Sequence, residues 1–172
     1  PTLPGFSYVP FDDLDTVAKA ITSQTCAILV EPIQSDGGVN VPGEGYLEGL
    51  REMCDQHDLL LIFDEMQTSP CRLGAFFGYQ TYGVIPDVLT MAKFLGGGTP
   101  IGAMLAKKEV AESFVPGTHA ATFGGNPLVT AAALATLETI VEEDLFKNVI
   151  SVGNYLEEKF TRLQELAPIK EI

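Results

Sequence analysis

The fold class of this chain is decided by the stretch Leu60-Leu61-Ile62-Phe63-Asp64-Glu65-Met66-Gln67-Thr68. Residues 59–63 are a continuous apolar run of strand length, and Asp64 follows it directly. A strand that is apolar on both faces is typical of a buried, mostly parallel sheet covered by helices. The carboxylate of Asp64 is therefore expected at the carboxyl end of a buried strand, the edge where open α/β sheets bind ligands.

Similar runs occur on both sides of this stretch, with helical spacing between them. Residues 45–57 place apolar side chains on one face of an amphipathic helix, and Asn126-Pro127 is a typical capped helix start. The repetition predicts an α/β fold, a mostly parallel sheet flanked by helices. The expected strands are residues 27–30, 59–63, 88–91 and 101–105. The expected helices begin near residue 12, span 45–57 and 128–141, and run from 142 or 145 to 166.

Composition excludes several classes of protein. The chain has 172 residues, is 46% hydrophobic and carries a net charge of −13, so an ordered domain with a solvated acidic surface is expected rather than a nucleic-acid surface. Cys26, Cys54 and Cys71 form no close pair, which predicts neither a disulfide framework nor a metal site and favours a reduced cytoplasmic setting. No apolar run reaches the roughly 18 residues of a membrane span, so no membrane association is expected.

A second ionisable residue, Lys93, follows the apolar run of residues 88–92 and precedes Gly96-Gly97-Gly98. A strand-end carboxylate together with such a lysine is what pyridoxal phosphate needs: a partner for the ring nitrogen and an amine for the aldehyde. Apolar walls around the lysine would favour the neutral amine, and glycines let backbone approach a flat ring. Taken singly, Asp64 reads as a cap of the next turn and Lys93 as a surface residue, but their joint occurrence favours the cofactor site.

Residues 117–127 form a glycine-rich turn that leads into a helix. Hydroxyls and backbone amides at such a turn can hold a phosphate, although this pattern is common. His119 lies within the turn and is interpreted as a polar loop residue.

With these residues assembled, the chain resembles the class III, or ornithine-type, aminotransferases among the fold-type I pyridoxal phosphate enzymes, and most of all their acetylornithine branch. The order and separation of four motifs carry the resemblance. They are Glu31-Pro32-Ile33-Gln34 with Gly37-Gly38, residues 63–68 with Arg72 and Gly74, Ala92-Lys93 with the glycines and Pro100, and residues 117–127.

The resemblance implies a role for five residues. Lys93 matches the Schiff-base lysine, which also moves the proton, and Asp64 matches the partner of the pyridinium nitrogen. Gln67 resembles the residue that hydrogen-bonds the phenolic oxygen of the cofactor. Thr122 matches a threonine that contacts the phosphate from the neighbouring subunit, which implies a homodimer with shared active sites. Glu31 resembles a glutamate on the substrate side.

Three departures from the family pattern concern the substrate. Asp36 stands where a glutamate is usual, so a carboxylate that helps to position substrate is one methylene shorter. Residues 69–71, Ser-Pro-Cys, replace glycines and stiffen their loop. Ala121 replaces a hydroxyl residue that borders the substrate site.

The implied function is transfer of the terminal amino group of N-acetylornithine, or a related ω-amino compound, to 2-oxoglutarate in cytoplasmic arginine biosynthesis. The alternatives are a class III enzyme acting on ornithine, succinylornithine, 4-aminobutyrate or diaminobutyrate, or an inactive fragment that only binds a partner. The phosphate motif, ring-stacking aromatic and substrate arginine of the family have no counterpart here. The resemblance therefore implies an internal piece, with residues 1–141 in the large cofactor-binding domain and 142–172 a helix leading into a truncated small domain.

Overall fold

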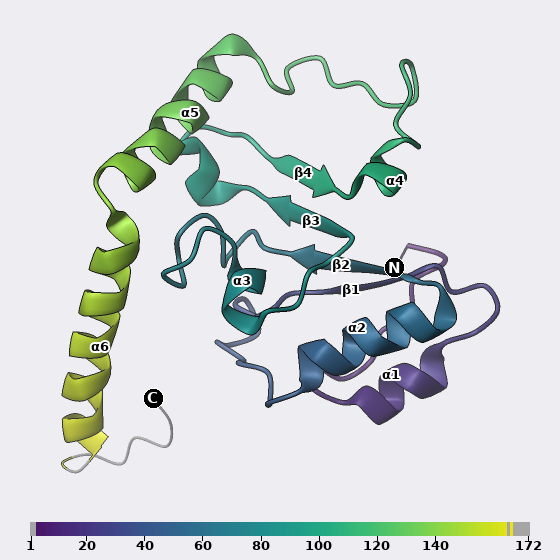
Figure 1. Ribbon diagram of the computed structural model, residues 1–172, viewed down its shortest axis with the longest axis horizontal. Helices are drawn as coiled ribbons and strands as arrows, with labels where there is room; N and C mark the ends of the chain where they lie inside the picture. Colours follow the sequence, from purple (N-terminus) through teal and green to yellow (C-terminus); the bar gives the residue numbers. More distant parts are fainter. Residues whose placement is uncertain (1–2, 165, 167–172) are drawn as a thin grey trace.

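The protein has an α/β fold in which strands and helices alternate over most of the chain (Figure 1). The structure is a computed structural model that describes residues 3–164 and 166. In the described ranges, no helix combines the length and apolar character that crossing a membrane requires. The elements in chain order are α1 (Leu14–Ala20), β1 (Ala27–Val30), α2 (Tyr46–His57), β2 (Leu60–Asp64), α3 (Gly78–Tyr82), β3 (Val88–Met91), the 3₁₀ helix η1 (Lys93–Gly96), β4 (Ala103–Ala106), α4 (Lys108–Ala111), α5 (Pro127–Glu142) and α6 (Leu145–Gln164).

The sheet has the strand order β1-β2-β3-β4, with the first three strands parallel and β4 antiparallel to β3. This confirms the predicted mostly parallel sheet. The fourth strand begins at Ala103 rather than residue 101 and runs back along β3, because the connection of residues 92–102, which contains η1, is too short for the crossover that a parallel pair needs. The carboxyl ends of β1, β2 and β3 therefore meet at one edge of the sheet, on the side to which the β2 and β3 arrowheads point in Figure 1.

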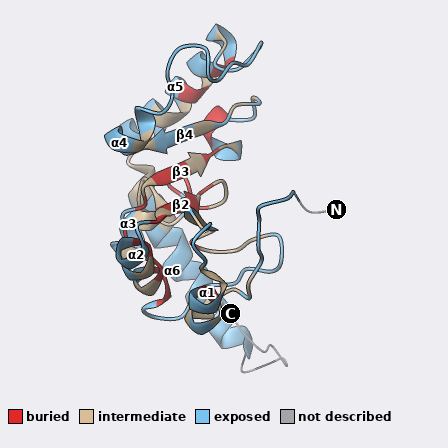
Figure 2. Cartoon of the chain, turned by 90° about the vertical axis from the view of Figure 1, so that its right-hand side faces the viewer, coloured by how far each residue is buried: buried red, intermediate tan, exposed pale blue. Residues whose placement is uncertain are grey.

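The main core lies between α2 and the sheet. Leu47, Leu50 and Cys54 on one face of α2 are buried against Leu61 and Phe63 of β2, as the amphipathic spacing predicted. Helix α1 covers α2 from outside (Figure 1), and its N-cap is Asp13, whose carboxylate accepts the Thr16 N–H at 2.9 Å. Figure 2 shows buried residues concentrated on β2, β3 and neighbouring segments.

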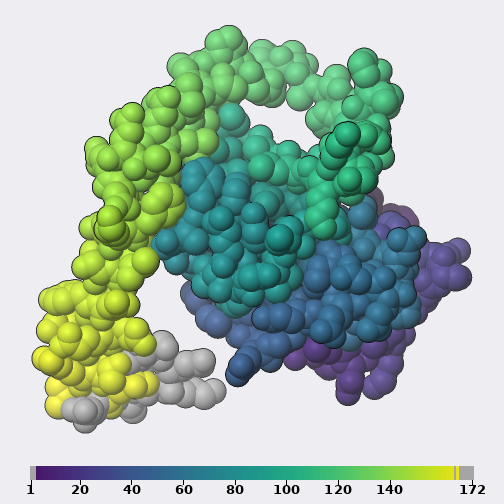
Figure 3. Space-filling model, in the orientation of Figure 1, coloured from purple at the N-terminus to yellow at the C-terminus, as the bar shows by residue number. Residues whose placement is uncertain are grey.

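A smaller cluster joins α5 to η1, with Met91, Leu95 and Ala133 at its centre. Helix α5 begins as predicted, since Asn126 accepts the Leu128 N–H at 3.1 Å and Pro127 occupies the first turn. Before it, residues 111–125 are all exposed and arch away from the sheet, with open space beneath them in Figure 3.

Helix α6 has no buried residue and extends away from the sheet (Figure 1). Only its first turns are held: Phe146 packs near Phe76, and Ile150 lies against Gly74. The apolar stripe predicted on this helix, Val152, Leu156, Phe160 and Leu163 with Val149, is present, and these first four side chains are 44–46% exposed. The predicted helix end at residue 166 lies two residues beyond the observed end at Gln164, and residues 165 and 167–172 lie outside the described part.

Candidate active site

Three ionisable residues follow the parallel strands at the carboxyl edge of the sheet. Glu31 comes after β1, Asp64 ends β2, and Lys93 lies two residues after β3. The register pairs Asp64 with Thr90. It also pairs Val30, directly before Glu31, with Phe63, directly before Asp64. Hydrogen bonding between strands, rather than contact between side chains, therefore places the two carboxylates and the amine together.

The charges at this edge act on one another. Partial burial raises the pKa of Glu31, and the negative charges of Asp64 and Asp36 raise it further. A backbone hydrogen bond from Ser35 and the positive charge of Lys93 act in the opposite direction. The structure thus brings together four of the predicted site residues, with Asp36 exposed in the turn that follows Glu31.

The carboxylate of Asp64 caps the turn that follows β2. Its Oδ1 accepts the Met66 N–H at 3.0 Å, which is the ordinary structural interpretation of a strand-end aspartate. This bond holds the side chain through only one of its two carboxylate oxygens. Gln67, partly buried, lies in the same turn, so the order along the chain keeps it beside Asp64.

Lys93 is the first residue of η1 and has a φ of +44°, in the left-handed region that favours glycine. The predicted apolar enclosure of this lysine is wrong for the described part of the chain, where its side chain is exposed. The physical reason is that β3 has ended and the turn carries Lys93 beyond the sheet. The amine is accordingly open to the space at the carboxyl edge.

The glycines after Lys93 serve the turn and its packing on α5. Gly97 has a φ of +56°, and a Cβ on it would come 2.7 Å from Thr136 Oγ1 of α5. A Cβ on Gly96 would come 2.8 Å from Ile101, whereas Gly98 has a φ of +105° and nothing within 4 Å. Gly96 and Gly97 therefore allow a close approach within the protein, and the predicted approach of this backbone to a flat ring stays a prediction.

The sequence interpretation gave no role to two residues close to this site. Glu65 is fully buried next to Asp64, and Arg72 places its guanidinium 4.4 Å from the centre of the Phe94 ring, the residue after Lys93. Glu65 stands out because its carboxylate is buried. The sequence does not reveal this burial, since Asp64 and Glu65 have the same pattern as an exposed acidic pair. Arg72 belongs to the motif of residues 63–68, which by itself implies no role for it.

Thr122 and Ala121 do not join the other site residues in the described structure. Both lie in the exposed arch of residues 111–125. His119, in the same arch, has its ring 6.2 Å from that of Phe114 in an edge-on arrangement, which agrees with its interpretation as a loop residue.

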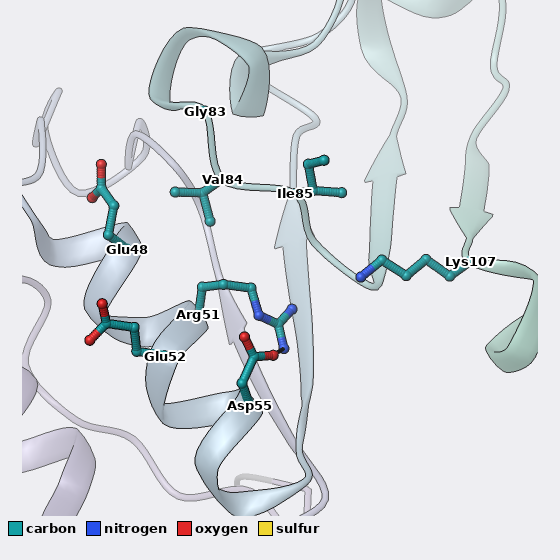
Figure 4. A pocket seen from close by; sticks show the side chains of 8 residues that line it. All are labelled: Glu48, Arg51, Glu52, Asp55, Gly83, Val84, Ile85 and Lys107. Carbon is teal, nitrogen blue, oxygen red and sulfur yellow. Dashed lines mark ion pairs between the residues drawn. The ribbon is translucent and has the colours of Figure 1, made fainter.

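A shallow surface hollow lies elsewhere, between α2 and the segment that precedes β3 (Figure 4). Arg51 and Lys107 approach it from opposite sides, and both pair with Asp87, which stands before β3 at the opposite edge of the sheet. Chemistry and strand topology, rather than concavity, therefore identify the candidate site in this chain.

Known proteins sharing this arrangement identify the family. Residues 6–172 match the family model described as aminotransferase class III. The chain belongs to the class III aminotransferases. An acetylornithine aminotransferase of Methanopyrus kandleri is 51% identical over 145 residues, which are 84% of this chain and 37% of that protein. An ornithine aminotransferase 2 of Staphylococcus aureus is 46% identical over 100% of this chain and 43% of its own length.

Solved structures of the family have the same fold. The ornithine aminotransferase of Toxoplasma gondii matches with a TM-score of 0.93 at 38% identity, over 100% of this chain and 42% of that one. The acetylornithine aminotransferase of Elizabethkingia anophelis matches with a TM-score of 0.90 at 37% identity, over 95% of this chain and 42% of that one. The chain thus spans about two-fifths of the length of these relatives.

Pyridoxal phosphate is the cofactor of class III aminotransferases, and the residues at the carboxyl edge fit it. An exposed primary amine and a carboxylate follow neighbouring parallel strands, as a ring with an aldehyde and a basic nitrogen requires. The carboxylate is already held by a backbone bond, so its direction is fixed before any ligand binds.

Proposed function

We propose that the protein containing this chain is a pyridoxal-phosphate-dependent aminotransferase that moves the terminal amino group of N-acetylornithine, or a related ω-amino compound, to 2-oxoglutarate. The observation that carries the proposal is the placement of Asp64 and Lys93 after neighbouring parallel strands. The acetylornithine aminotransferases among the relatives, at 46–51% identity, support the choice of amino donor.

Each site residue has a task that its position supports. Pyridoxal phosphate, when bound, supplies an electron sink for the carbon that carries the amino group. Lys93 would hold the cofactor through its aldehyde carbon and would be the group that moves the proton. Asp64 keeps the ring nitrogen protonated, and Gln67 donates to the phenolic oxygen. Glu31 lies on the substrate side, where burial and the charges of Asp64 and Asp36 raise its pKa.

Three further features belong to the proposal. Asp36 and Ala121 border the substrate and help to select the donor. Residues 1–141 form part of the cofactor-binding domain, and α6 leads into a second domain that covers its exposed apolar stripe. The setting is cytoplasmic arginine biosynthesis, in agreement with free cysteines at Cys54 and Cys71, both buried.

The protein acts as a homodimer with shared active sites. Thr122 contacts the cofactor phosphate of the neighbouring subunit, and the complete exposure of residues 111–125 supports this arrangement. The substrates are an amino donor and 2-oxoglutarate, and the net charge of −13 gives no support for nucleic acid as a partner.

The experiment uses the full-length protein. Added pyridoxal phosphate is expected to give an absorbance band at roughly 410 to 430 nm through the Lys93 amine. Lys93→Ala should abolish the band, and Lys108→Ala, at an exposed lysine of α4, should keep it. No band from the wild-type protein would sink the enzyme proposal and leave the binding-module alternative.

Ornithine transfer is the second candidate, because an ornithine aminotransferase matches the whole chain at 46% identity. A comparison of kcat/KM for N-acetylornithine, succinylornithine, ornithine, 4-aminobutyrate and diaminobutyrate, each with 2-oxoglutarate, separates the candidates. A preference of at least about tenfold for N-acetylornithine supports the proposal, and the reverse preference overturns that choice of donor.

A further inference from the structure

Glu65 is a fully buried carboxylate surrounded by hydrogen-bond donors. Its Oε1 accepts the Tyr79 N–H at 2.8 Å, and its Oε2 accepts the Gly78 N–H at 2.5 Å. The hydroxyls of Ser69 and, at 3.4 Å, Thr68 also reach Oε2. No lysine or arginine pairs with Glu65 within the described residues, so hydrogen bonds alone offset the cost of burying this group.

These bonds close the loop of residues 66–77 at both ends. Ser69 belongs to its first turn, and Gly78 and Tyr79 begin α3 immediately after it. A Cβ at Gly78 would come 2.8 Å from Thr68 and 3.2 Å from Glu65 Oε2, so the two ends approach too closely for any residue but glycine. One carboxylate therefore ties the two ends of the loop together.

The loop in turn supports η1, the 3₁₀ helix that begins with Lys93. Arg72 extends from the loop and places its guanidinium 4.4 Å from the centre of the Phe94 ring. Lys93, directly before Phe94, has a left-handed backbone conformation, which is strained for a residue with a side chain and persists only where neighbouring groups hold it. The Glu65 backbone adds a second link, because its N–H donates to the carbonyl of Thr90 at 2.9 Å.

We propose that Glu65 is a positioning residue whose buried carboxylate, acting through the 66–77 loop and the contact of Arg72 with Phe94, sets the direction of Lys93. The role rests on the proposed function, since it is the chemistry of Lys93 that depends on it. Glu65 is fully buried and bonded to groups of its own chain, so the proposed role acts through other residues. Its alternative is a purely structural role, in which the loop matters for stability alone.

The test compares variants of the full-length protein loaded with pyridoxal phosphate. Glu65→Gln keeps the size of the side chain but turns an amide NH₂ toward a backbone N–H. Arg72→Met removes the cation from an exposed side chain and leaves the core untouched, and Arg72→Lys restores a cation. The matched controls are Glu138→Gln on α5 and Arg162→Met on α6, both at exposed positions.

Three readouts separate positioning from stability. In Glu65→Gln and Arg72→Met, the pH midpoint of the band at roughly 410 to 430 nm should shift by at least about 0.5 unit. Turnover should fall at least about tenfold with KM changed less than about threefold. Without added cofactor, amides of residues 93–98 should exchange hydrogen at least about threefold faster. Arg72→Lys should recover part of each change, and the controls should show none.

A folded Glu65→Gln variant with a lower melting temperature but unchanged midpoint, turnover and exchange would overturn the positioning role. If that variant does not fold, Arg72→Met decides: changed readouts support the role, and wild-type readouts overturn it. A wild-type protein that shows no band overturns the proposed function itself, together with this role, and is thus distinguishable from the other results.

Discussion

Asp64 and Thr90 are register partners on the neighbouring parallel strands β2 and β3. Because Lys93 follows Thr90 by three residues, this pairing holds a carboxylate and an amine at one edge of the sheet without any bond between them. The main chain thus fixes the spacing that a ring with two reactive ends requires, and the side chains stay available for the ligand.

The charge of Asp64, rather than its cap, is expected to matter for turnover. Asp64→Asn keeps an oxygen that can accept the Met66 N–H, so the melting temperature should hardly change. Turnover of the full-length enzyme should fall about 100-fold or more, because a neutral amide does not keep the ring nitrogen protonated. Steady-state kinetics check the loss, and Asp58→Asn, at an exposed helix end, is the control. Normal turnover in Asp64→Asn would contradict the assigned role.

Glu31 predicts a pH dependence of stability. Burial, with the charges of Asp64 and Asp36, raises the pKa of Glu31 above its ordinary value of 4.5. A raised carboxyl pKa favours the protonated form in the folded state, so this contribution to stability is complete below pH 4.5 and is lost as pH rises through the folded value. Glu31→Gln should therefore stabilise the protein at pH 7, by less than about 1 kcal/mol because solvent screens a partly exposed group.

Denaturant unfolding of the full-length protein at pH 7 and pH 4 measures this effect. The gain from Glu31→Gln should be present at pH 7 and absent at pH 4. Asp36→Asn should reduce the gain, since it removes one of the repelling charges. A Glu31→Gln protein that is less stable than wild type at pH 7 would show that the carboxylate has a favourable partner instead.

Much of this architecture can be predicted from apolar runs, helical spacing and polar residues at strand ends. The first three strands, α2 and the start of α5 are where the sequence predicts them, because a continuous apolar run or a capped start determines each locally. The direction of β4 cannot be predicted in this way, since a short apolar run has the same pattern in either direction.

The candidate site is predicted only in part for similar reasons. Strand topology brings Asp64 and Lys93 together, and topology follows from the element order. The burial of Glu65 depends on Gly78 and Tyr79, whose N–H groups the chain brings back to its carboxylate. No local sequence pattern encodes a contact between residues so far apart in the chain. The left-handed conformation of Lys93 is equally hidden, because lysine rarely adopts it and neighbouring packing imposes it.

Asp87 is expected to stabilise the edge of the sheet opposite the site. Its carboxylate accepts Arg51 Nη1, Lys107 Nζ and the Leu61 N–H, each at 2.8 Å. Burial alone would raise the pKa of Asp87, but these three donors together lower it. A lowered carboxyl pKa contributes stability that is present above the ordinary value of 3.8 and is lost as pH falls through the folded value.

Asp87→Asn should therefore destabilise the full-length protein by about 2–4 kcal/mol at pH 7, because it leaves Arg51 half-buried without its main partner. Urea unfolding at pH 7 and below pH 3 checks the amount and its loss in acid. Asp55→Asn is the matched control, since Asp55 pairs with the same arginine but has a side chain that is 67% exposed. Equal losses from both variants would show that the pairing at Asp87 has no special weight.

The shared active sites proposed above predict that two inactive subunits restore one another. In a mixed dimer of Lys93→Ala and Thr122→Val subunits, one site combines both defects and the other combines an intact Lys93 with an intact Thr122. A homodimer with shared sites should therefore regain about half of the wild-type turnover, although each variant alone is weak. Co-expression with two affinity tags, isolation of the mixed dimer and kinetics measure this. If each subunit is self-sufficient, the mixture gives only the average of its parents, and Thr122 then acts within its own subunit or not at all.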